Sequence, residues 1–185
     1  MEQALVFASI IVGVAVSDQI LSLHRLLRSR VPVKWHWAQP WFAFLVLLLN
    51  VMIWWSIVGQ SQQSMTIGEF VPTLIQLILL ALLTISTLPD HIAPEGVNLA
   101  DYYQANRRYQ WTLLACALGW DMLIDVVKEV RDGATFFGAV SNQSEDGLVM
   151  AIMIALAFTR RWTFVAIGMA LLSLGPVNWL SRGAG

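Results

Sequence analysis

The sequence predicts an all-α polytopic integral membrane protein, a bundle of about six transmembrane helices forming one domain over residues 1–185. Hydrophobic residues make up 57% of the chain and charged residues only 12%, whereas soluble domains carry roughly 25% charged residues. The mean hydropathy is +0.65. Because the apolar residues are gathered in long blocks, we expect lipid rather than water to surround them.

Six apolar segments follow one another along the chain. A helix needs about 20 residues, rising 1.5 Å each, to cross roughly 30 Å of hydrocarbon. Five segments have about this length. The fifth in chain order reaches it only when residues 147–159 are extended, with Ser144 as a cap and Glu145 and Asp146 in the first turn. The predicted spans are 4–24, 37–58, 70–88, 111–130, 144–161 and 162–180.

The basic residues predict the orientation, because cytoplasmic loops carry an excess of Lys and Arg. With six spans and both termini outside the cytoplasm, the inner segments hold eight basic residues and the outer segments hold three. No basic residue precedes the first apolar run, so we expect it to be a retained helix rather than a secretory signal. The inner residues are Arg25, Arg28, Arg30, Lys34, Arg107, Arg108, Arg160 and Arg161, and the outer ones are Lys128, Arg131 and Arg182.

The long inner segment before the fourth span has helix signals of its own. Asn98, with Asp101 three residues later, resembles a capping box. No helix breaker follows before Asp132–Gly133. We therefore predict one continuous helix over residues 99–130, and we expect Phe136 and Phe137 beyond it to lie in the outer interface.

Short motifs in this region resemble those of a family of small bacterial inner-membrane proteins that has no assigned activity. The resemblance covers most of the chain and implies a bacterial inner (plasma) membrane and the same architecture, but no function. The residues that carry it are Leu88–Pro89–Asp90, Gly96, Tyr103, Arg107–Arg108, Asp121 and Asp125.

Polar side chains inside the predicted spans are the first candidates for function, because a carboxylate at a helix centre costs roughly 2.5–3.5 kcal/mol on insertion scales. Asp121 lies near the middle of the fourth span, and Asp18 lies in the inner half of the first. These carboxylates could form a proton relay or a hydrated transport path. They could equally be structural, with Asp125 paired to Lys128. The candidate path residues are Asp121, Asp18, Asp125, Asn50 and Gln76, the last two as hydrogen-bonding partners.

The three histidines support a second hypothesis. His24, His36 and His91 all lie on the predicted inner side, where they could ligate a metal or supply axial ligands to a haem. Interfacial histidines without such a role are the alternative. No cofactor is required by any other pattern in the sequence.

The partners predicted by charge are lipids. The inner basic residues suit anionic headgroups at the cytoplasmic face, although they could act as a topology signal alone. A net charge of −1 gives no indication of a nucleic-acid partner. The sequence does not decide between a monomer and a homodimer. The candidate headgroup residues are Arg25, Arg28, Arg30, Lys34, Arg107 and Arg108.

Three functions therefore remain open. The first is a small channel or transporter that uses the intramembrane carboxylates. The second is a haem- or metal-binding redox subunit, and the third is a non-catalytic sensor or partner subunit. The sequence contains no HExxH, GxSxG, CxxC or glycine-rich phosphate motif, which favours a role other than catalysis. The single cysteine, Cys116, excludes an intrachain disulfide.

Overall fold

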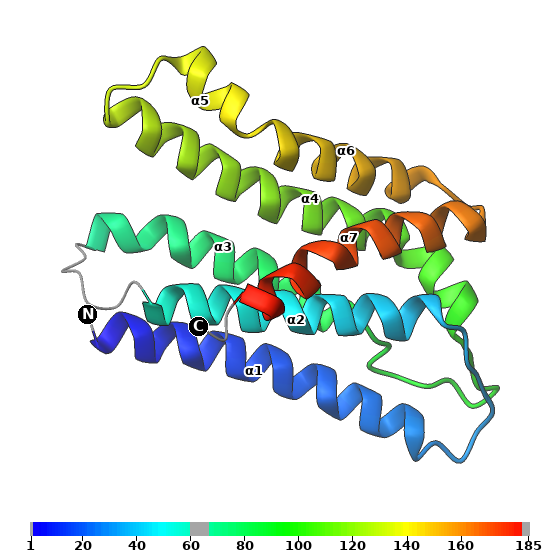
Figure 1. Cartoon of the computed structure of the whole chain (residues 1–185). Coiled ribbons are helices and arrows are strands. Elements are labelled where there is room, and N and C mark those ends of the chain that lie inside the picture. The colour runs from blue at the N-terminus through cyan, green and yellow to red at the C-terminus, as the bar shows by residue number, and fades with distance from the viewer. Residues whose placement is uncertain (1, 60–66, 183–185) are drawn as a thin grey trace.

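The computed structural model describes residues 2–59 and 67–182, and this part of the chain is mainly helical (Figure 1). It contains seven helices and two short strands. In chain order these are α1 (Glu2–Leu27), β1 (Val33–Lys34), α2 (Ala38–Gly59), α3 (Ile67–Ile85), β2 (Val97–Asn98), α4 (Leu99–Arg131), α5 (Phe136–Asn142), α6 (Ser144–Phe158) and α7 (Trp162–Arg182).

Six of the helices form an elongated bundle in which successive long helices run in opposite directions (Figure 1). α4 packs along α3 on one side and along α6 on the other, and α1 packs along α3. α2 contacts α1, α3, α4 and α7. The short α5 joins the outer end of α4 to α6, and α7 runs back across α2 toward the end at which α1 begins.

The core lies where α2, α3, α4, α6 and α7 meet. Phe42 of α2 and Trp111 of α4 are both fully buried, and their rings pack edge to face at 4.9 Å. Leucines from α3 and methionines from α6 and α7 complete this cluster. A second, smaller cluster at the inner end joins Leu26, Leu88 and Leu99.

Large apolar side chains also cover the outside of the bundle. Phe137, Leu27 and Leu148 are 85%, 66% and 65% exposed. Soluble monomers rarely show continuous apolar patches of more than a few hundred Å². Such a surface is the one expected of helices that contact lipid.

Three helices are long and apolar enough to cross a membrane, namely Leu5–Leu27, Ala38–Gly59 and Trp162–Trp179. Phe70–Ile85 is apolar but shorter. The prediction that α4 would also qualify by length and composition is not confirmed among the described residues, because its outer half carries several charged side chains. The all-α class and the apolar membrane-type helices are confirmed, whereas a full set of six spans is not.

Two helices end before the predicted spans do. The third helix ends at Ile85 rather than at Leu88, and the Ser86 and Thr87 amides close its last turn by donating to the Leu82, Leu83 and Thr84 carbonyls. α6 ends at Phe158, with an extended Thr159 after it, and not at Arg161. Ser144 begins α6 as its first residue and is not the cap, a position that Gln143 occupies without a side-chain hydrogen bond.

The continuous fourth helix was predicted correctly. α4 extends over Leu99–Arg131. The Asn98 side chain accepts a hydrogen bond from the Ala100 amide, and its own amide donates to Asp101 at 2.7 Å. These bonds satisfy groups that the first turn of a helix leaves unpaired.

The sequence analysis missed the strands. β1 and β2 pair in parallel, Val33 with Val97 and Lys34 with Asn98. The Val97 amide also donates to the Pro32 carbonyl at 3.1 Å. This pairing joins the segment after α1 to the segment before α4, so that the two predicted inner loops lie together at one end of the bundle.

Gly96 allows this strand pairing because of its backbone conformation and its lack of a side chain. Its φ is +97°, a region in which residues with a Cβ are strained. A Cβ at this position would also collide with the Pro32 carbonyl group.

We therefore predict that Gly96→Ala lowers the free energy of unfolding by at least about 1–2 kcal/mol, from the backbone conformation alone. Thermal unfolding of the detergent-solubilised chain would measure this loss. The control is Gly147→Ala, because Gly147 lies in α6 with open space around its Cα. That control should be neutral or slightly stabilising, and equal effects of the two substitutions would contradict the prediction.

Candidate functional site

Asp121 of α4 is hydrogen-bonded to a side chain of the neighbouring helix. Gln76 of α3 donates from Nε2 to Asp121 Oδ1 at 3.1 Å. Asp121 is half-buried between the two helices. One residue earlier, Trp120 Nε1 donates to the Pro72 carbonyl of α3 at 2.9 Å. Two side-chain bonds therefore join α4 to α3 at this level, and the predicted contact between Gln76 and a carboxylate is confirmed.

The groups beyond Asp121 are more exposed. Asp125 lies one turn further along α4 and pairs with Lys128 at 3.2 Å. The side chains of Lys128 and Asp125 are 64% and 45% exposed, so this pair contributes little to stability. Asp146, in the first turn of α6, lies within electrostatic range of Asp121. Three carboxylates, Asp121, Asp125 and Asp146, thus lie in the part of the bundle formed by the carboxyl-terminal half of α4 and the start of α6.

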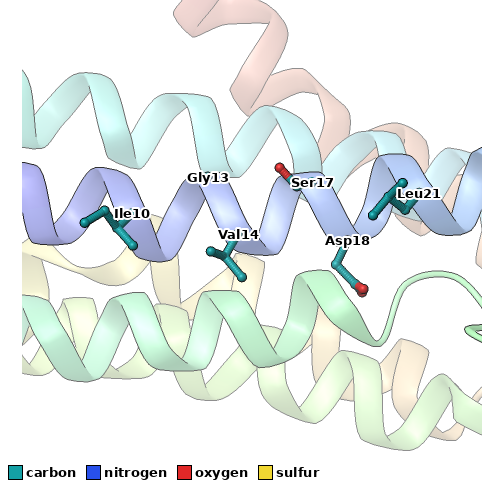
Figure 2. A pocket seen from close by; sticks show the side chains of 6 residues that line it. All are labelled: Ile10, Gly13, Val14, Ser17, Asp18 and Leu21. Carbon is teal, nitrogen blue, oxygen red and sulfur yellow. The ribbon is translucent and has the colours of Figure 1, made fainter.

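Asp18 lies elsewhere. It belongs to one face of α1, where it lines a shallow groove of about 440 Å³ with Ile10, Gly13, Val14, Ser17 and Leu21 (Figure 2). Its Oδ2 atom is buried and has no hydrogen-bonding partner. Among residues 2–59 and 67–182 no hydrogen bond or ion pair joins Asp18 to Asp121, so the structure does not bring the two together.

A polar cluster surrounds the turn that follows α3. The last carbonyls of the helix accept from the Ser86 and Thr87 amides. The Ser86 and Thr87 carbonyls, just beyond the helix, pair with side chains of other helices. Gln39 of α2 donates to the Thr87 carbonyl. Gln110 and Tyr102 of α4 both donate to the Ser86 carbonyl, at 2.6 and 3.1 Å.

Two further amides extend this polar cluster. Gln19 of α1 donates to the Ala43 carbonyl at 2.7 Å and to Thr87 Oγ1 at 3.1 Å. Asn50 of α2 donates to Thr84 Oγ1 at 2.8 Å. Because the Thr84 hydroxyl gives its own hydrogen to the Leu80 carbonyl, it can only accept from Asn50, which fixes the orientation of that amide.

Several side-chain oxygens in this cluster are left without donors. Gln39 Oε1, Asn50 Oδ1 and Gln110 Oε1 are buried and have no hydrogen-bonding partner in the structure. Each amide uses its nitrogen to cap a carbonyl or hydroxyl, so its oxygen must find a donor elsewhere. Water molecules or a small cation could satisfy such oxygens.

An apolar layer separates the two polar levels. From Gln76 to Thr84, α3 rises about 12 Å, and the inward side chains between them are leucines. Leu77, Leu80 and Leu83 are at most 2% exposed, and Leu114 of α4 faces the same core at 4%. The carboxylate level and the amide level are therefore not connected by polar side chains.

The histidines lie apart from these levels. His36 stacks on Trp162 with 4.1 Å between the ring centroids, and its Nδ1 accepts from the Ala38 amide at 3.4 Å. No group of three or more His, Cys, Asp or Glu side chains in the described part of the chain is placed to hold a metal. The predicted convergence of His24, His36 and His91 is therefore not seen.

The predicted headgroup residues differ in how far their side chains are buried. Arg25, Arg28, Arg30, Lys34 and Arg108 are exposed. Arg107 is only 6% exposed and lies on the same face of α4 as the buried Tyr103 and Trp111. The sequence does not distinguish Arg107 from Arg108, because helical periodicity within one polar stretch does not show which of them faces inward.

Comparison of the chain with protein-family models, with curated proteins and with solved structures finds no match. The class that the structure itself defines is a helical protein with three helices able to cross a membrane.

Two tyrosines near the inner end are held in their neutral form. Burial raises the pKa of Tyr102 to about 12, and the nearby Asp90 acts in the same direction. Burial also raises the pKa of Tyr103 to about 12, although the hydrogen bond from Trp111 partly opposes this.

Because the pKa of these phenols is higher in the folded than in the unfolded chain, they stabilise the fold fully below pH 10, and this stability is lost as the pH rises through about 12. In Tyr109→Phe, only these two tyrosines remain. We predict that the absorbance change at 295 nm then begins well above pH 10 and coincides with unfolding. Ionisation near pH 10 in the folded protein would contradict the prediction.

The Ser86 carbonyl accepts from both Gln110 and Tyr102, so the contribution of these two donors to stability can be tested. We predict that Gln110→Leu and Tyr102→Phe are each mild, because each leaves the other donor in place. The double variant leaves the carbonyl unpaired, which costs about 1–3 kcal/mol, so its loss of unfolding free energy should exceed the sum of the single losses. Strictly additive losses in chemical denaturation would show that the two donors do not share this role.

Proposed function

We propose that this chain is a six-span protein of the bacterial inner membrane with both termini outside the cytoplasm. Six antiparallel helices, α1, α2, α3, α4, α6 and α7, provide the spans. The segments that hold most of the basic residues meet at one end, because β1 pairs with β2 and Gln104 donates to the Arg160 carbonyl at 3.2 Å. This common end agrees with the excess of positive charge that cytoplasmic segments carry.

The charged residues of α4 are compatible with a span because of their surroundings. α4 is covered by α3 on one side and by α6 on the other, and its carboxylates lie on the faces toward these helices or near the outer end. At 15 residues, α6 rises about 22 Å, so the bilayer would thin or α5 would enter the interface beside it. Phe136 and Phe137 of α5 are 62% and 85% exposed and suit that interface.

Our proposal for the activity is passage of protons or another small cation through the bundle past Asp121. The observation that carries it is the Gln76–Asp121 bond within the apolar helix layer. An ionisable side chain in a membrane core is expensive and commonly marks an ion pathway. The carboxylates Asp125 and Asp146 nearby would attract cations to the outer entrance.

The path in this proposal has two halves. The outer half ends at Asp121, and the inner half consists of the amide oxygens around the end of α3. The leucine layer between them closes the path in this conformation. Opening would require α3 to move against α4, which would break the bonds of Gln76 and Trp120.

The same hydrogen bond also favours a second candidate function. A polar pair between two membrane helices can serve only to hold them together, as expected for a non-catalytic sensor or partner subunit. In that case Asp121 and Gln76 would matter for assembly and not for flux. No observation in the structure favours the redox alternative over these two.

We predict that Asp121→Asn reduces cation flux to the background of empty liposomes, because the amide keeps the shape and the bond to Gln76 but cannot exchange a proton. Proteoliposomes with an internal pH-sensitive dye and an imposed gradient would measure this flux. Asp132→Asn is the matched control, since Asp132 is exposed at the end of α4 and lies outside the proposed path. It should retain the wild-type rate.

Flux in Asp121→Asn equal to that of the wild type would overturn the transport proposal. If wild-type liposomes show no flux, and Gln76→Leu and Asp121→Leu both lower thermal stability, the pair is a structural clamp. The subunit role would then be favoured.

A further inference from the structure

Three arginines meet at the inner end of the bundle. Arg107 and Arg108 lie on α4, and Arg160 lies in the segment between α6 and α7. The two elements are in contact, because Gln104 Nε2 donates to the Arg160 carbonyl at 3.2 Å. Arg108 lies over the ring of Phe158, 5.5 Å from its centroid. The guanidinium groups are thus gathered at the α4–α6 junction.

Within the described part of the chain no carboxylate forms an ion pair with this cluster. Arg107 is 6% exposed, and one of its NH groups donates to the Gln104 carbonyl. The ion pair found among residues 2–59 and 67–182 joins Asp125 to Lys128 at the opposite end of α4. Burial and the neighbouring Arg160 and Arg108 lower the pKa of Arg107, and no carboxylate opposes them.

Two buried atoms in this cluster lack hydrogen-bonding partners. Arg107 Nε is a donor without an acceptor, and Gln104 Oε1 is an acceptor without a donor. The two residues are three positions apart, so they lie on the same side of α4. The orientation of the Gln104 amide is fixed, because its nitrogen must donate to the Arg160 carbonyl.

We propose that Arg107, Arg108, Arg160 and Gln104 form a binding site for a phosphate ester that carries a hydroxyl group, as a glycerophosphate headgroup does. The phosphate oxygens accept from the guanidinium groups, whose geometry matches a phosphate. The hydroxyl donates to Gln104 Oε1. The ligand would come from an anionic lipid of the inner leaflet or from a soluble phosphoester, both of which share this chemistry.

The membrane position of the site favours the lipid source. Basic pockets between helices on the cytoplasmic side are typical sites for anionic headgroups. Trp162 and Tyr103 pack together beside the cluster, 5.7 Å apart, and such aromatic residues are common at the level of headgroups. This site is more than 10 residues along α4 from Asp121, so the proposal does not depend on the proposed transport path.

The test uses the full chain in detergent and counts bound lipids by native mass spectrometry. Phosphatidylglycerol and phosphatidylethanol carry the same net charge, but only the first ends in a glycerol with free hydroxyls, and the second has no other hydrogen-bond donor in its headgroup. We expect the wild type to prefer phosphatidylglycerol. Arg107→Gln and Arg160→Gln should each weaken its binding about tenfold or more, as expected for loss of a hydrogen bond to a charged group.

Two further variants make the result specific. Gln104→Leu leaves the charge unchanged and should abolish the preference for phosphatidylglycerol over phosphatidylethanol. Arg131→Gln removes an equally charged, exposed side chain at the other end of α4 and should leave both the binding and the preference intact. Because Arg160 is exposed, its variant is expected to fold even if Arg107→Gln does not.

A soluble ligand is distinguished by a separate arm. Glycerol 3-phosphate is added to the wild type and to Arg160→Gln, and the melting temperature of each is measured. A rise for the wild type alone, together with no binding of phosphatidylglycerol, would identify a soluble phosphoester as the ligand of the same site. Equal binding of both lipids, or an equal loss for Arg131→Gln and Arg160→Gln, would overturn the proposal in favour of unspecific charge attraction.

Discussion

The arrangement of the bundle depends on the fact that α3 ends inside the protein and not at a surface. The two residues that follow it, Ser86 and Thr87, form a turn that is partly buried at the first and buried at the second, and an unpaired buried carbonyl is costly. Donors must therefore come from other helices. Gln39 of α2 and Gln110 of α4 supply them, so a single helix terminus determines where two neighbouring helices must lie along their axes.

This constraint also explains how polarity is distributed in the molecule. The amides that bind the turn after α3 lie toward the carboxyl end of that helix, and Asp121 with Gln76 forms a separate level nearer its amino end. The leucines between them give α3 and α4 a dry contact. A bundle built in this way is held at two polar levels, and the apolar layer between them can pack without directional bonds.

Much of the fold could be predicted from the sequence, because apolar runs and capping signals are local. The full length of α4 follows from the Asn98–Asp101 motif and the absence of a breaker, and pairing of Asp125 with Lys128 follows from helical spacing. The strands and the end of α3 could not be predicted, since both depend on partners far along the chain. Gln39 and Gln110 were missed for the same reason, although an amide next to an apolar run is a signal that could have drawn attention to them. Arg107 was recognised as basic, but its burial depends on tertiary packing, which the helical pattern does not show.

The pairing of β1 with β2 has a consequence for the assembly of the protein during synthesis. Val33 emerges early, together with the first two helices, but its partner Val97 follows only after the third helix is complete. The backbone N–H and C=O groups of β1 thus stay without their strand partner until then. Before that point the hairpin of α1 and α2 can still change its depth and tilt in the membrane. Once Gly96 has adopted its positive φ and Val97 has paired with Val33, the α1–α2 hairpin and the α3–α4 hairpin are fixed relative to each other. The order of translation thus sets the order in which the bundle becomes rigid.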